Sequence, residues 1–120
     1  MAKILIVDDS KMSRKMLRNI LEGIGHDIAG EAVNGEEGVK LYKQLRPDAV
    51  TMDITMPEMD GLSSLKAIKE FDADARVVMI TAAGQSSKLM DALKLGAKEF
   101  ICKPYEPEQV INAFEEVLKD

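Results

Sequence analysis

Five polar residues of this chain have the types that phosphoryl transfer requires, and each lies at or just after the end of a short apolar segment. Asp8 and Asp9 follow the first segment, and Asp53 ends the third. Thr81 ends the fourth, and Lys103 lies just after the fifth. A carboxylate can attack phosphorus and form an aspartyl phosphate. A divalent cation, a lysine and a hydroxyl can then hold the phosphoryl oxygens.

The apolar segments that precede these residues have the composition of strands. Three of them are nearly continuous in apolar residues, which is typical of strands covered on both faces. Between the segments, apolar residues recur at helical spacing. We therefore expect five helices to alternate with five strands, at residues 3–7, 27–32, 49–53, 76–81 and 99–102.

Capping residues mark several of the expected helix ends. Ser10 can cap the first helix, and Gly25 can end it. Asn34 and Glu37 have the spacing of a capping box. Pro107 suits the first position of the last helix.

Several sulfur-containing side chains are expected in the core. Met12, Met16 and Met90 recur with other apolar residues at helical spacing, and Cys102 lies within the last strand. Free cysteine usually behaves as a small buried apolar group.

Alternating strands and helices predict an α/β fold, with a parallel sheet and helices on both faces. Ligands of such sheets bind at the carboxyl ends of the strands. The five polar residues should therefore gather along one edge of the sheet, to which the second strand contributes nothing obvious. Pro57 and Gly61 should turn the chain away from Asp53 and leave its side chain open to solvent.

Three carboxylates at one edge create an electrostatic problem that a cation would solve. Two like charges about 4 Å apart repel by roughly 4 kcal/mol at an effective dielectric of about 20, and Lys103 offsets only one of the three. The remaining charge requires a divalent cation or raised carboxyl pKa values. A cluster of oxygen ligands suits Mg²⁺, for which Mn²⁺ can substitute, better than zinc.

Composition excludes several other classes of protein. A net charge of −5 argues against direct nucleic-acid binding. The absence of a long apolar run and of a signal peptide argues against a membrane protein and favours the cytoplasm. One cysteine and one histidine leave no disulfide, no zinc cluster and no Ser/His/Asp triad.

Four stretches, "ILIVDDS", "VTMDITMPEMDG", "VVMITAAG" and "GAKEFICKP", resemble the receiver domains of bacterial response regulators. The resemblance covers the chain end to end, with the motifs in the family's order and spacing. It implies a flavodoxin-like (βα)5 doubly wound sandwich with strand order 2-1-3-4-5. It also implies a single receiver domain at residues 1–120 with no output domain.

The resemblance gives each polar residue an expected role. Asp53 would accept a phosphoryl group from a histidine kinase. Asp9 would be the direct Mg²⁺ ligand, together with Asp53 and the backbone carbonyl of Thr55, and Asp8 would act mainly through water. Such a protein is not an enzyme in the usual sense, because it catalyses only its own phosphorylation and slow autodephosphorylation.

The resemblance further implies a switch. Thr81 and Lys103 would be drawn toward the phosphoryl group, and the ring of Phe100 would turn inward. The surface of the fourth helix, fifth strand and fifth helix would then bind a protein partner, such as the flagellar motor switch in chemotaxis. A phosphatase is a further expected partner, and the Lys103-Pro104 bond is expected to be cis. Phe100 stands where many chemotaxis members have tyrosine.

Three other functions compete with the chemotaxis reading. A receiver domain of this kind can instead serve a phosphorelay outside chemotaxis. A Mg²⁺-dependent phosphatase would carry an acid two residues after Asp53, where this chain has Thr55. A flavodoxin would have a phosphate-binding loop where this chain has Asp8 and Asp9, and the chain has no tryptophan to cover a flavin.

Overall fold

Five strands and five helices alternate along the chain. The structure is a computed structural model, and it describes residues 2–56 and 59–119. Its elements are β1 (Lys3–Val7), α1 (Lys11–Gly23), β2 (Asp27–Ala32), α2 (Gly35–Leu45), β3 (Ala49–Asp53), α3 (Gly61–Phe71), β4 (Val77–Thr81), α4 (Ser86–Lys94), β5 (Glu99–Cys102) and α5 (Pro107–Val117). The strand bounds agree with those expected, apart from a one-residue later start of β4.

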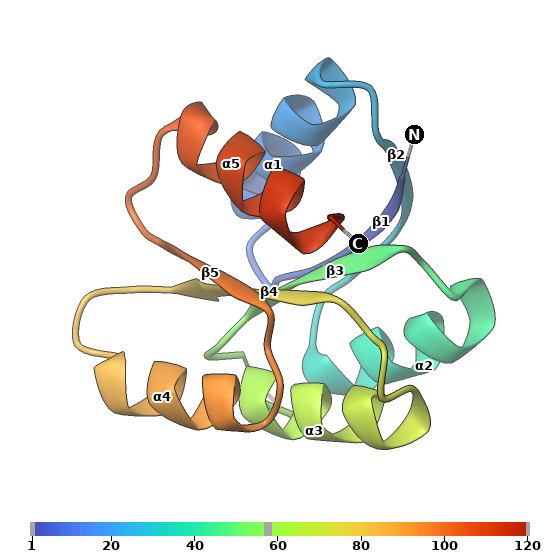
Figure 1. The fold of residues 1–120 in the computed structure, drawn as a ribbon, viewed down its shortest axis with the longest axis vertical. Helices are drawn as coiled ribbons and strands as arrows, with labels where there is room; N and C mark the ends of the chain where they lie inside the picture. The colour runs from blue at the N-terminus through green and yellow to red at the C-terminus, as the bar shows by residue number, and fades with distance from the viewer. Residues whose placement is uncertain (1, 57–58, 120) are drawn as a thin grey trace.

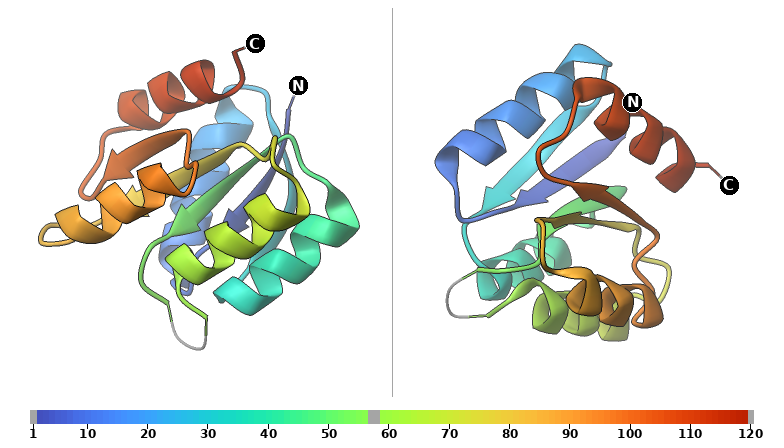
Figure 2. Two further views of the ribbon diagram at one scale, coloured as in Figure 1. Left: turned by 60° about the horizontal axis from the view of Figure 1, so that its bottom comes forward. Right: turned by 90° about the vertical axis from the view of Figure 1, so that its left-hand side faces the viewer.

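The strands form one parallel sheet in the order β2-β1-β3-β4-β5. Helices α1 and α5 cover one face of this sheet, and α2, α3 and α4 cover the other (Figure 1). The two further views show the same three layers (Figure 2). The flavodoxin-like doubly wound fold and its strand order are therefore confirmed.

Each face of the sheet has its own apolar core, because side chains alternate along a strand. On β1, Ile4 and Ile6 pack in the core that includes Phe114 of α5. Leu5 and Val7 pack in the opposite core, under α2 and α3. Every residue of β3 and β4 is buried, which confirms that the central strands are covered on both faces.

The expected helix caps are present. The backbone N–H of Ser13 donates to the hydroxyl of Ser10 at 3.2 Å. The N–H of Glu37 donates to Oδ1 of Asn34 at 2.8 Å, as expected, and the Glu37 carboxylate accepts from the N–H of Val33 at 3.1 Å, one residue before the position that a capping box uses. Helix α1 ends before Gly25, which has a positive φ of 95°, and α5 starts at Pro107.

The predicted core positions of three methionines and the cysteine are wrong. Met12, Met16 and Met90 are 74%, 48% and 55% exposed. A helix packed on a sheet buries only one stripe, and in α1 Leu17 and Leu21 occupy it. Cys102 is exposed as well, because β5 lies at the edge of the sheet and buries only Ile101 among its four residues.

Two remaining expectations concern the backbone. The Lys103-Pro104 peptide bond is cis, as the family resemblance implies. Pro57, expected to turn the chain after β3, lies outside the described residues. Within the part of the chain that the structure describes, no helix is both long enough and apolar enough to cross a membrane.

Candidate functional site

The register of the sheet sets the predicted residues side by side. Val7 of β1 lies opposite Met52 of β3, so Asp8 comes level with Asp53. Asp53 in turn pairs with Ile80, one residue before Thr81. The carboxyl ends of β1, β3 and β4 therefore meet at one edge, as expected for parallel strands.

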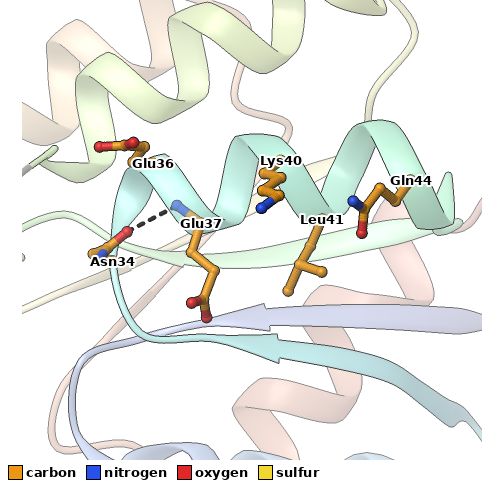
Figure 3. Close-up of a pocket in the computed structure, with 6 residues that line it drawn as sticks. All are labelled: Asn34, Glu36, Glu37, Lys40, Leu41 and Gln44. Atoms are coloured by element: carbon orange, nitrogen blue, oxygen red, sulfur yellow. Dashed lines mark hydrogen bonds between the residues drawn. The ribbon is translucent and has the colours of Figure 1, made fainter.

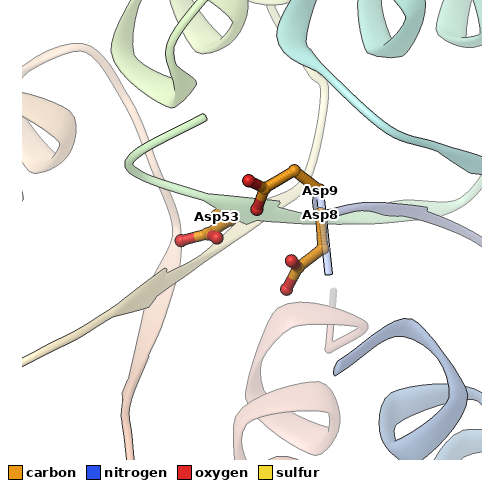
Figure 4. Close-up of side chains that lie close together, drawn as sticks. All are labelled: Asp8, Asp9 and Asp53. Atoms are coloured by element: carbon orange, nitrogen blue, oxygen red, sulfur yellow. The ribbon is translucent and has the colours of Figure 1, made fainter. Parts of the chain in front are cut away.

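Three carboxylates converge at this edge. One oxygen from each of Asp8, Asp9 and Asp53 lies within 4.8 Å of the other two. Figure 4 shows Asp8 and Asp9 projecting just past β1, beside Asp53 at the end of β3. The ammonium of Lys103 lies 3.9 Å from an oxygen of Asp8 and 3.9 Å from an oxygen of Asp53. The clustering predicted from the strand ends is thus confirmed.

Burial raises the pKa of two of these carboxyl groups, Asp8 and Asp53. The side chain of Asp53 is only 12% exposed, so it is less open to solvent than the sequence suggested. Burial, with repulsion from Asp8, raises the pKa of Asp53 to about 6, and attraction by Lys103 opposes this rise. Burial also raises the pKa of Asp8, although the N–H of Ser10 donates to its Oδ1 at 2.8 Å and lowers that pKa.

The same carboxylates fit a hard divalent cation. Oδ2 of Asp8 is buried and, among the described residues, has no hydrogen-bond partner. A buried carboxylate oxygen without a donor is costly, and a bound cation would satisfy it. The ligand atoms that the cluster offers to a metal are all carboxylate oxygens, which suits Mg²⁺.

Thr81 and Lys103 flank the carboxylates on the side of β4 and β5. The Thr81 hydroxyl is buried and donates to Sγ of Cys102 at 3.3 Å. The N–H of Lys103 donates to the Thr81 carbonyl at 2.7 Å. These residues line a hollow of about 310 Å³ beside the site. Phe100 lies earlier on β5, opposite Met79 of β4, and is 41% exposed.

Gly61 fixes the chain beneath the phosphoacceptor candidate. Its N–H donates to the Ile54 carbonyl at 2.7 Å, at the first residue of α3. A Cβ at this position would collide with the backbone carbonyl oxygen of Asp53. Glycine is therefore required here by the close approach of two backbone segments.

An ion-pair network lies behind the site, and it was not predicted from the sequence. Arg14 of α1 donates to the backbone carbonyl of Asp8 at 2.8 Å and to the Glu31 carboxylate at 3.0 Å. Arg18, one helical turn later, donates to the other oxygen of Glu31 at 2.8 Å. Strand β2, which had no obvious part in the site, thus anchors α1 and supports Asp8. The only signal in the sequence is the spacing of two arginines on one helical face.

A larger hollow lies away from this chemistry. It has a volume of about 560 Å³, runs along α2, and contains none of the three aspartates (Figure 3). Its walls are Asn34, Glu36, Glu37, Lys40, Leu41 and Gln44. Mixed charges and an exposed helix surface give it no set of groups that could act on a phosphoryl group.

The chain belongs to the response regulator receiver domain family, whose profile matches residues 4–115. Receiver domains of this family are generally not true enzymes. They use Mg²⁺, and the acidic cluster at the sheet edge agrees with that use. The family assignment rests on nearly the whole chain.

Individual relatives are similar over nearly their whole length. The chain is 47% identical to the chemotaxis protein CheY of Thermotoga maritima, with 98% of both chains covered. It is 49% identical to CheY of Bacillus subtilis, with 97% of both covered. Among solved structures, a CheX-CheY-BeF3-Mg complex from Borrelia burgdorferi matches with a TM-score of 0.94 and 43% identity, covering 98% of this chain and 90% of that one.

Proposed function

We propose that this protein is a response regulator whose Asp53 accepts a phosphoryl group from a histidine kinase in the presence of Mg²⁺. One observation carries the proposal: three carboxylates meet within 4.8 Å, next to a lysine, at the carboxyl edge of a parallel sheet. The receiver family to which the chain belongs supports it as well.

The chemistry assigned to Asp53 is nucleophilic. A carboxylate oxygen of Asp53 attacks phosphorus, an O–P bond forms, and the P–N bond of the phosphohistidine donor breaks with its electron pair leaving on nitrogen. A divalent cation held at this edge would supply positive charge to offset that of the phosphoryl oxygens. Asp8, Asp9, Asp53 and the Thr55 carbonyl would hold this cation. Lys103, already 3.9 Å from Asp53, supplies a further positive charge.

The output is a change of surface. A phosphoryl group adds negative charge and acceptor oxygens, which would attract Lys103. They would also draw the Thr81 hydroxyl away from its present acceptor, Sγ of Cys102. The ring of Phe100, now 41% exposed, could then turn inward. The surface formed by α4, β5 and α5 would thereby change, and a protein partner would recognise the new shape.

Similarity to CheY proteins supports a role in cytoplasmic chemotaxis signalling, with the flagellar motor switch as the candidate target. The solved complex of CheX with CheY supports a CheX-like protein as a second partner, and a phosphatase is a further proposed partner. Autodephosphorylation would be slow, and no other substrate would be turned over. The two alternative functions of this protein itself, a regulator in a non-chemotaxis phosphorelay and a Mg²⁺-dependent phosphatase, are not favoured by the comparisons.

Acetyl phosphate and Mg²⁺ test the proposal directly. Intact mass should show one phosphoryl adduct on the wild type, and hydroxylamine should remove it. Asp53→Asn should form no adduct, whereas Asp91→Asn, an exposed aspartate on α4, should behave as the wild type. Labelling of Asp53→Asn at the wild-type rate would remove Asp53 from its role.

A further inference from the structure

Gln85 joins two loops that flank the phosphoacceptor. It lies between β4 and α4, and it is half-buried although Ala82 is exposed. Its Nε2 donates to Oγ1 of Thr55 at 2.6 Å, and its Oε1 accepts the backbone N–H of Ala82 at 2.7 Å. The two ends of one amide therefore hold the loop after β3 against the loop after β4.

This bridge takes the side chain away from its usual local partner. Gln85 occupies the position just before α4, where polar side chains often bond to the first turn of their own helix. Within the described residues, the Gln85 side chain makes no such bond. Both polar ends of the amide instead bond to the loops that follow β3 and β4.

Thr55 connects this bridge to Asp53. It lies two residues after Asp53, and its backbone N–H lowers the pKa of the Asp53 carboxyl, while its hydroxyl accepts a hydrogen bond from Gln85. Two hydrogen bonds therefore join Ala82, just after β4, through the Gln85 side chain to Thr55, whose backbone follows Asp53 by two residues. Thr55 itself is exposed, and an exposed loop residue without such a contact would sample other conformations.

We propose that Gln85 is a positioning residue for Mg²⁺ binding. Gln85 holds Thr55 so that the Thr55 carbonyl and the Asp53 carboxylate keep the arrangement that binds the ion. The inference rests on the proposed function, in which that carbonyl is a ligand. Groups behind metal ligands commonly fix their orientation, and a ligand set that is already ordered binds with a smaller entropic cost.

Mg²⁺ affinity without a phosphodonor, measured by isothermal titration calorimetry, tests this role. Gln85→Met keeps the length of the side chain and removes both hydrogen bonds, and Thr55→Val removes the hydroxyl alone. We expect Gln85→Met to weaken Mg²⁺ binding by about three- to ten-fold, the range for one or two lost hydrogen bonds. Gln44→Met, the same substitution at an exposed position of α2, should leave the affinity unchanged.

A double-mutant cycle separates a bridge from two independent effects. If Gln85 acts through Thr55, the double variant should bind Mg²⁺ no more weakly than Gln85→Met. The Mg²⁺ concentration for half-maximal labelling by acetyl phosphate should rise in Gln85→Met, while the rate at saturating Mg²⁺ falls by a smaller factor. Unchanged Mg²⁺ affinity in Gln85→Met, or additive losses in the double variant, would overturn the proposal.

Amide hydrogen exchange in metal-free buffer reports on the bridge itself. The Ala82 N–H should exchange faster in Gln85→Met and remain protected in Thr55→Val, whose Gln85 is intact. Equal Ala82 exchange in Gln85→Met and the wild type would show that the bridge does not form. Failure of the wild type to bind Mg²⁺ would instead refute the proposed function, so the two failures are distinguishable.

Discussion

Replacing Asp53 with asparagine should stabilise the metal-free protein at neutral pH. Burial raises the pKa of Asp53 from its ordinary value of 3.8 to about 6, so the folded state binds the proton more tightly than the unfolded chain does. Stability from this group is therefore complete below about pH 4 and is lost as pH rises through about 6. Asparagine carries no charge and avoids this loss.

The size of the effect follows from the same values. The difference between 3.8 and about 6 is about two pKa units, and each unit corresponds to about 1.4 kcal/mol. Asp53→Asn should therefore raise the free energy of unfolding by about 3 kcal/mol at pH 7, or Tm by roughly 10 °C for a domain of this size. At about pH 4.5 the gain should fall to about 1 kcal/mol, because Asp53 is then protonated in the folded wild type.

Urea denaturation with EDTA, at both pH values, measures these differences, and Asp91→Asn serves as the exposed control. Adding Mg²⁺ at pH 7 should then stabilise the wild type by mass action and the Asn variant much less. Equal stabilities at pH 7 without metal, or the same gain at both pH values, would show that charge burial at Asp53 is not the cause.

Three further substitutions test other parts of the structure by urea denaturation. Thr51→Val should raise the free energy of unfolding by about 1 kcal/mol, because the Thr51 hydroxyl is buried and has no hydrogen-bond partner among the described residues; a destabilised variant would contradict this. Gly61→Ala should lower it by about 2 kcal/mol and slow acetyl phosphate labelling, since the new Cβ meets the backbone of Asp53, the proposed phosphoacceptor; wild-type stability would show that the loop yields freely. Arg14→Met should lower it by about 1 to 2 kcal/mol through the lost bond to the Asp8 carbonyl, and a loss no larger than that of the exposed control Lys11→Met would refute that reasoning.

The sheet and the acidic edge could be predicted because they depend on local, repeated patterns. Apolar runs define the strands, and parallel strands place their carboxyl ends together whatever the side chains do. Asp8 and Asp53 therefore converge through the register of β1 and β3 alone. The direction of their pKa rise could be predicted, although burial contributes more to it than the repulsion between like charges from which it was inferred.

Details that depend on contacts between distant segments could not be predicted. In α1, the methionines and leucines form adjacent stripes, and only packing decides that Leu17 is buried while Met16 is exposed. The bonds of Gln85 and Arg14 depend on side-chain rotamers meeting loops 30 and 6 residues away in sequence. No local pattern marks Gln85, and for Arg14 the sequence offers only its helical spacing to Arg18, which does not name the Asp8 carbonyl as its partner.

The exposed thiol of Cys102 has a practical consequence for anyone who wishes to watch this protein work. The chain has one cysteine and no tryptophan, so a maleimide dye is the obvious reporter, and it would attach at the sulfur that accepts the Thr81 hydroxyl. Such a dye would lie beside the Thr81 hydroxyl, whose movement is part of the proposed switch. A fluorescent version should therefore start from Cys102→Ser, with a new cysteine placed on the far side of the sheet.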